Sequence, residues 1–153
     1  MKLRRALTGA LVALTAAAAG ILVAQPAYAA PGLCNATGYP SGRTVYADND
    51  NNGGGAYVTA TLCWKSRGNG YYDTFVTWDV TDTLANDAGA TIRMEWTGTD
   101  GDTHYDVPPS SQRAWTAWAT ADGDWVKSNI KNLYIRACLT NTTSEAHHCG
   151  PKW

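Results

Sequence analysis

Residues 48–53 hold oxygen-bearing side chains at the spacing of a calcium-binding loop. Their sequence, DNDNNG, places carboxylate or amide groups at alternate positions and ends in glycine, as in loops that direct several oxygens at one hard cation. The twelfth position is Thr59, where such loops carry a bidentate glutamate. The same residues are typical of solvated turns, because Asn, Asp and Gly tolerate left-handed backbone. We therefore expect a turn and no metal or cofactor, with calcium as the alternative.

A second set of polar residues, which could carry out acid–base chemistry, lies between residues 95 and 106. Asp102, His104 and Asp106 alternate along the chain, so on a strand their side chains share one face. A carboxylate that orients a histidine is a common acid–base arrangement, and Glu95 on the preceding expected strand could complete a ribonuclease-like site. The sequence has no G-x-S-x-G, H-E-x-x-H or P-loop motif. We therefore expect a protein that is not an enzyme.

Tryptophan is the residue type most available for binding, with seven in the chain. Three of them fall on apolar faces of expected strands and are assigned to the core: Trp64, Trp78 and Trp96. Trp115, Trp118 and Trp125 have no such assignment. Exposed tryptophans next to Asp and Asn could stack on sugar rings or anchor a protein partner. Trp115, Trp118 and Trp125 are therefore the candidate binding residues.

Alternation of apolar and polar side chains predicts the elements that would position these residues. Turn signals, including Asp-Gly-Asp at 100–102 and 122–124, recur about every ten residues. This spacing predicts an all-β fold, an antiparallel two-layer β-sandwich of about seven to eight strands. The expected strands cover 43–47, 56–65, 71–82, 90–97, 103–107, 113–120, 125–127 and 133–139.

The first 29 residues have the layout of a secretory signal peptide. A basic start (KLRR, residues 2–5) precedes an apolar run over 6–24, and Ala27-Tyr28-Ala29 is a small-x-small cleavage site. This pattern predicts a secreted, extracellular protein that is cleaved after Ala29, rather than one that stays anchored in a membrane. The expected divisions are a signal peptide over 1–29, a flexible N-terminal arm over 30–42 and a sandwich domain over 43–153.

The expected mature chain is acidic. The signal segment holds three of the 12 Lys and Arg and none of the 13 Asp and Glu, which leaves nine basic and 13 acidic residues and a net charge of −4 with histidine neutral. Such a chain lacks the basic footprint of a nucleic-acid-binding protein and the polybasic run that binds anionic membranes. Secreted proteins are the expected partners, with a glycan as a further possibility.

The four cysteines, Cys34, Cys63, Cys138 and Cys149, are an even number in an exported chain, which indicates two disulfides. Three pairings are possible. We favour Cys34–Cys63 and Cys138–Cys149, because the second closes a short polar loop after an expected strand, a closure that contributes about 3 kcal/mol. The histidine pair before Cys149 lacks a third ligand for zinc.

Two segments resemble a pattern found in small secreted actinobacterial β-sandwich proteins. In 78–96 (WDVTDTLANDAGATIRMEW), a D-T-x-A-D/N-x-x-x-A stretch joins two core strands, and in 137–149 (ACLTNTTSEAHHC) a cysteine pair closes the C-terminal end. Most such proteins have no assigned activity. Some small secreted β proteins of these bacteria are non-catalytic subunits of umbrella-type toxin particles, in which they bridge larger components. The resemblance implies such a role and transfers no functional residue.

Together these patterns predict a secreted, non-catalytic interaction or assembly module, and the resemblance implies a subunit of an extracellular toxin-like complex. Its arm over 30–41 could add a strand to a partner's sheet. One alternative is a carbohydrate-binding module that uses the three candidate tryptophans. The other is an inhibitor of a secreted hydrolase that presents the loop of Arg43, Arg67 or Arg113.

Overall fold

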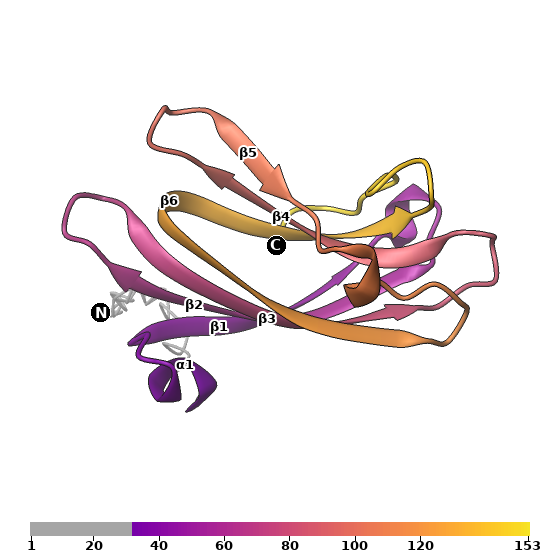
Figure 1. The fold of residues 1–153 in the computed structure, drawn as a ribbon, viewed down its shortest axis with the longest axis horizontal. Coiled ribbons are helices and arrows are strands. Elements are labelled where there is room, and N and C mark those ends of the chain that lie inside the picture. The colour runs from indigo at the N-terminus through magenta and orange to yellow at the C-terminus, as the bar shows by residue number, and fades with distance from the viewer. Residues whose placement is uncertain (1–31) are drawn as a thin grey trace, which may run out of the picture.

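A computed structural model describes residues 32–153, and the expected signal peptide over 1–29 lies outside this range. The described residues form six β-strands and little helix (Figure 1). The predicted all-β antiparallel fold is confirmed. The strands are β1 (Ser41–Asp48), β2 (Ala56–Ser66), β3 (Tyr72–Asp82), β4 (Gly89–Thr97), β5 (Thr103–Asp106) and β6 (Thr120–Thr140), and the short helices are α1 (Gly32–Ala36), η1 (Asp50–Asn52) and η2 (Ser110–Gln112).

The strands are hydrogen-bonded in the order β1-β2-β3-β6-β4-β5, and every neighbouring pair is antiparallel. The first half of β6 pairs with β3 and the second half with β4. Figure 1 shows β6 running beside β3, turning, and returning beside β4. The turn contains Asn129 and Asn132, whose φ angles of 58° and 54° lie in the left-handed region that asparagine tolerates. β6 therefore joins the two parts of the sheet.

The structure differs from the sequence prediction along β6. The expected strands at 125–127 and 133–139 are parts of this one strand, and the expected turn at 122–124 lies inside it, paired with β3. Gly123 is opposite Trp78, and a Cβ on Gly123 would come within 2.6 Å of the Trp78 ring. The glycine that resembles a turn signal thus makes room for a buried tryptophan. Of the expected strand over 113–120, residues 113–119 are irregular apart from an isolated bridge between Ala114 and Ala90, and Thr120 begins β6.

The core is one cluster of buried apolar side chains from β1, β2, β3, β4 and β6. They follow the period of two that is typical of strands with one buried face: in β3, Val76, Trp78 and Val80 are at most 2% exposed. Trp78 and Trp96, which were assigned to the core, are buried there, and Trp64 packs partly buried against the cluster. No helix in residues 32–153 is long and apolar enough to cross a membrane.

Two disulfides fasten the terminal segments to the sheet. Cys34–Cys63 joins α1 to β2, and Cys138–Cys149 joins the C-terminal segment to β6. Both favoured pairings are confirmed. Of the segment 30–42 that was expected to be an arm, Gly32–Ala36 is helical with Cys34 fully buried, and β1 begins at Ser41.

The C-terminal segment, residues 147–153, lies along β6 and bonds to its backbone. The N–H groups of His147 and Gly150 donate to the carbonyls of Leu139 and Ala137, each at 2.9 Å. The segment also packs on the loop that resembles a calcium site. There the buried Asn49 amide donates to the His148 carbonyl at 3.0 Å and accepts from the Ala56 N–H at 2.9 Å.

We predict that Gly150→Ala weakens this docking. A Cβ at Gly150 would overlap the backbone carbonyl of Asp48, so the mutation should lower the free energy of unfolding by about 2 kcal/mol, as for other overpacked sites. Gly32→Ala is the control, because a Cβ there meets no atom within 4 Å, and its effect should stay below about 1 kcal/mol. Urea unfolding followed by circular dichroism would measure both. Equal effects of the two mutations would contradict the close packing of Gly150.

Candidate interaction surface

The residues suggested for acid–base chemistry lie on opposite faces of the sheet. In the β4–β5 register, Glu95 is opposite Tyr105, and Trp96 is opposite His104. His104 therefore shares the inner face with Trp96, on which its ring stacks at 5.9 Å. Its Nε2 atom lies 2.8 Å from a carboxylate oxygen of Asp100. Glu95 and His104 are not brought together, and no ribonuclease-like pair forms.

The three candidate tryptophans have different surroundings. Trp118 is 76% exposed in an irregular turn, and Trp115 is 41% exposed, with its indole N–H donating to the Ser110 carbonyl at 2.7 Å. Trp125 is only partly exposed: its ring lies 5.2 Å from that of Trp96, and its N–H donates to Asp106 at 2.9 Å. Trp125 therefore belongs to a packed aromatic pair, whereas Trp115 and Trp118 present ring surface to solvent.

The three arginines that an inhibitor could present to a hydrolase are not equally free to enter an active site. Arg113 is buried and donates to the Pro108 carbonyl at 2.7 Å and the Thr140 hydroxyl at 3.2 Å. Arg67 forms an ion pair with Asp73 at 2.8 Å. Arg43 is exposed, but it lies within β1 and not in a loop.

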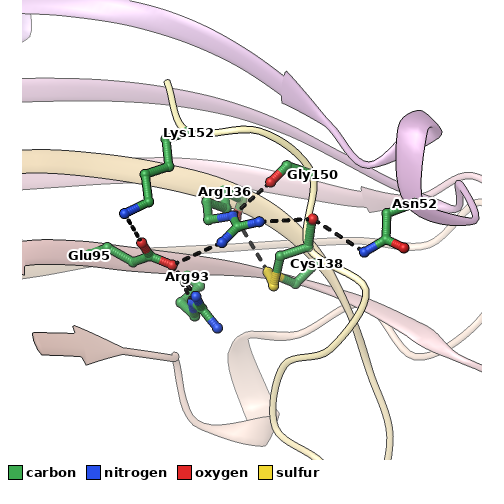
Figure 2. A network of polar contacts seen from close by, with 8 residues as sticks. Asn52, Arg93, Glu95, Arg136, Cys138, Gly150 and Lys152 are labelled. Atoms are coloured by element: carbon green, nitrogen blue, oxygen red, sulfur yellow. Dashed lines mark hydrogen bonds and ion pairs between the residues drawn. A yellow bond between two sulfur atoms is a disulfide. The ribbon is translucent and has the colours of Figure 1, made fainter. Parts of the chain in front are cut away.

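The outer face of β4 and β6 carries an ion cluster centred on Glu95, whose side chain is 4% exposed (Figure 2). Lys152 of the C-terminal segment places Nζ 2.8 Å from Oε2 of Glu95. Arg136 of β6 places Nη1 3.3 Å from Oε1, and Arg93 of β4 donates to the same oxygen through Nε at 2.7 Å and through Nη2. One buried carboxylate thus holds three cations from three segments.

Strand register explains why this cluster is needed. Arg93 and Arg136 are directly opposite each other in the β4–β6 ladder, and like charges in that position destabilise a sheet. Glu95, two residues along β4, accepts from both. Arg136 also donates to the carbonyls of Gly150 at 2.6 Å and Cys149 at 3.0 Å. The cluster therefore cancels a cross-strand repulsion and fixes the C-terminal segment at the same time.

The charge state of Glu95 follows from these contacts. Burial is the largest single effect and by itself would raise the pKa of Glu95, but the hydrogen bonds and charges of Lys152 and Arg93 together outweigh it and hold the pKa below its usual value. The carboxylate is thus ionised at neutral pH. With one negative and three positive groups, the cluster keeps a charge of +2.

Two exposed tyrosines flank Glu95, one on each neighbouring strand. Tyr105 of β5 and Tyr134 of β6 are both directly opposite it and are 61% and 39% exposed. The Arg93 guanidinium lies 5.0 Å from the centre of the Tyr105 ring, and Lys152 Nζ lies 5.7 Å from that of Tyr134. We call this set the Glu95 surface; it comprises Arg93, Glu95, Tyr105, Tyr134, Arg136 and Lys152.

The sequence suggested Glu95 only as a partner of His104, and its partners on β6 and the C-terminal segment were missed. The signal that could have found them is the rarity of glutamate, because the sequence contains only two, Glu95 and Glu145. Within residues 32–153 no three His, Cys, Asp or Glu side chains gather as metal ligands would. No family model, curated protein or solved structure matches this chain.

We predict that Glu95→Gln lowers the free energy of unfolding by about 3 kcal/mol at pH 7, as expected when one partner of a buried ion pair is removed. Because the folded-state pKa of Glu95 is lowered, its contribution is fully present above the unfolded pKa and is lost as pH falls through the folded pKa. The difference between wild type and mutant should therefore shrink below about pH 4.

Glu145→Gln is the control for this measurement. Glu145 also pairs with an arginine, Arg113 at 3.5 Å, but its side chain is 75% exposed, so the mutation should cost less than about 1 kcal/mol. Chemical denaturation at pH 7 and at about pH 3 measures both variants. A Glu95→Gln effect that is independent of pH would contradict the electrostatic role of Glu95.

Proposed function

We propose that the protein is a secreted, non-catalytic interaction module that binds an acidic partner protein through the Glu95 surface. The observation that carries the proposal is the surplus of positive charge on this face: three cations surround one carboxylate, while the expected mature chain has a net charge of −4. A basic face on an acidic protein steers and orients acidic partners.

The side chains of the Glu95 surface are those that dominate protein interfaces. Tyrosine and arginine are enriched at binding hot spots, because each combines a large contact area with a polar group. Tyr105 and Tyr134 supply exposed rings, and Arg93 lies over one of them. The face therefore offers both apolar contact and charge to a partner.

The Glu95 surface is also held in place before any partner arrives. Its residues lie on β4, β5 and β6 or on a segment tied down by Cys138–Cys149, and the ion cluster restrains the long side chains. Such preorganisation reduces the entropy lost on binding. A carboxylate held by three cations is poorly suited to accept or donate a proton, which favours binding over catalysis.

More specifically, we propose that this chain is a subunit of an extracellular, antibacterial toxin-like complex. Its bent sheet would act there as a two-layer sandwich that bridges larger components. Two disulfides and the absence of a spanning helix in residues 32–153 are compatible with secretion. The size of the native species in culture supernatant tests this form: a discrete complex supports it, and a free monomer contradicts it.

We predict that Tyr105→Ala combined with Tyr134→Ala weakens partner binding by at least about tenfold, as expected for hot-spot residues. The partner is first identified by cross-linking and mass spectrometry of culture supernatant, and affinity is then measured with the purified partner. Binding by wild type should weaken as salt rises, because the contact is partly ionic.

Tyr46→Ala combined with Tyr57→Ala is the matched control. These tyrosines of β1 and β2 are 59% and 41% exposed, closely matching Tyr105 and Tyr134, but lie away from the Glu95 surface. The control double mutant should bind like wild type. Equal weakening by both double mutants, or by neither, would rule out the Glu95 surface as the binding face.

Carbohydrate binding is the second candidate, and the surroundings of Trp115 favour it. Its exposed ring lines a groove with Asn141, Thr142, Thr143, Ser144 and Glu145. An aromatic ring beside hydroxyl, amide and carboxylate groups suits a sugar, which has both an apolar face and a rim of hydroxyls.

We predict that, if a glycan is the ligand, Trp115→Ala abolishes retention on insoluble polysaccharide. Trp125→Ala is not a suitable control because Trp125 is packed against Trp96; Trp118→Ala tests the more exposed ring. Removing one stacking ring should weaken binding by about tenfold or more. A glycan array that shows no binding by wild type would exclude this function.

A further inference from the structure

A separate concave site lies where β6 passes from β3 to β4. Tyr72–Ile130 is the last pair of β6 with β3 in this direction, and Thr97–Lys131 is the first pair with β4. The ladder is irregular between Tyr72 and Thr74, as is common where a strand must bend. The bend leaves a groove of about 340 Å³, a size typical of small-ligand pockets. In Figure 1 this bend is the turn of β6 at the left.

The groove has an apolar and aromatic lining. Leu62 and Ile130 are buried at its base, and Trp64, Tyr72 and Leu133 are partly exposed in it. Aromatic and branched side chains of this kind favour a flat apolar ligand, which gains both burial and ring stacking.

The polar residues of the groove carry an unbalanced positive charge. Residues 32–153 contain nine Lys and Arg, and six of them form ion pairs. Arg43 and Lys131, two of the remaining three, both line this groove, and no Asp or Glu lines it with them. The Lys131 ammonium lies 5.2 Å from the ring centre of Tyr71, which precedes the groove residue Tyr72 in the chain.

Arg43 and Lys131 differ in this respect from most cations of residues 32–153, which form ion pairs. With 13 acidic residues in the mature chain, a cation can readily find a carboxylate, and most of them do. Two cations beside an apolar groove without a carboxylate have the charge that an anionic ligand would complement.

We propose that this groove binds a small organic anion with a flat apolar body and a carboxylate group. The body would lie against Trp64 and Tyr72, and the carboxylate would pair with Arg43 and Lys131. Arginine suits this role because its planar guanidinium can donate two parallel hydrogen bonds to a carboxylate. The site is separate from the Glu95 surface and does not depend on it.

The test uses two probes of nearly equal shape, 2-naphthoate and the neutral 2-naphthamide, titrated into the folded protein with detection by two-dimensional NMR. The carboxylate should bind at least about tenfold more tightly than the amide, as expected for a charge-assisted contact. The largest shifts should fall on groove residues such as Thr74 and Asn132. Because this comparison uses wild type alone, it remains decisive if a variant fails to fold.

Arg43→Gln combined with Lys131→Gln should remove the preference for the carboxylate and leave affinity for the amide unchanged. Lys65→Gln is the control: Lys65 is the third unpaired cation of residues 32–153 and follows Trp64, so on a strand its side chain points to the opposite face. Equal affinity for the two probes, no saturation by the carboxylate at about 10 mM, or equal loss in the Lys65→Gln control would each overturn the proposal.

Discussion

Strand β6 pairs with the backbone N–H and C=O groups of both β3 and β4, two strands that are not paired with each other in the sheet. β3 and β4 are consecutive in the chain, yet each is paired with a different half of β6. Without β6 both would leave a row of backbone N–H and C=O groups unpaired beside the core, which is costly wherever water is excluded. The apolar cluster contains side chains from both halves of the sheet, so its closure depends on this one strand. The path of β6 from β3 to β4 also creates the groove at its bend, and it brings Lys131 to that groove and Arg136 to Glu95.

Charge is distributed unevenly over this framework. Arg93 of β4 and Arg136 of β6 gather around Glu95 on one outer face, while Asp79 and Asp122 are directly opposite each other in the β3–β6 ladder and are both exposed. Asp82 shows the opposite electrostatic situation to Glu95. Burial raises the pKa of Asp82, and the hydrogen bond from the Leu84 N–H only partly offsets this effect. Asp82 therefore opposes stability at neutral pH and does so less as pH falls, whereas Glu95 supports stability at neutral pH and loses that role in acid.

The alternating strands of the fold could be predicted from the sequence, and so could both disulfides, because these depend on local pattern and on the number and spacing of cysteines. The continuity of β6 could not be predicted, because the Asp-Gly-Asp at 122–124 has the composition of a turn. Its glycine is needed for a different reason: a side chain at Gly123 would collide with the ring of Trp78, which is far away in the sequence. The local sequence pattern also could not show that Glu95 and His104 lie on opposite faces of the sheet. That depends on the β4–β5 register, and a shift of one residue would move every side chain of a strand to the other face. The Glu95 surface combines β4, β6 and the C-terminal segment, and only the long-range pairing brings them together.

The attachment of Lys152 has a consequence for when the charged face is complete. Lys152 reaches Glu95 from a segment that Cys138–Cys149 clamps to β6. In a chain with reduced cysteines, that segment is retained by hydrogen bonds to β6, by the Asn49 amide and by the ion cluster, and terminal segments without a covalent tie fray more readily. The Cys138–Cys149 disulfide therefore adds a covalent restraint to the position of Lys152, and the geometry of the Glu95 surface is linked to the redox state of two cysteines that lie outside it.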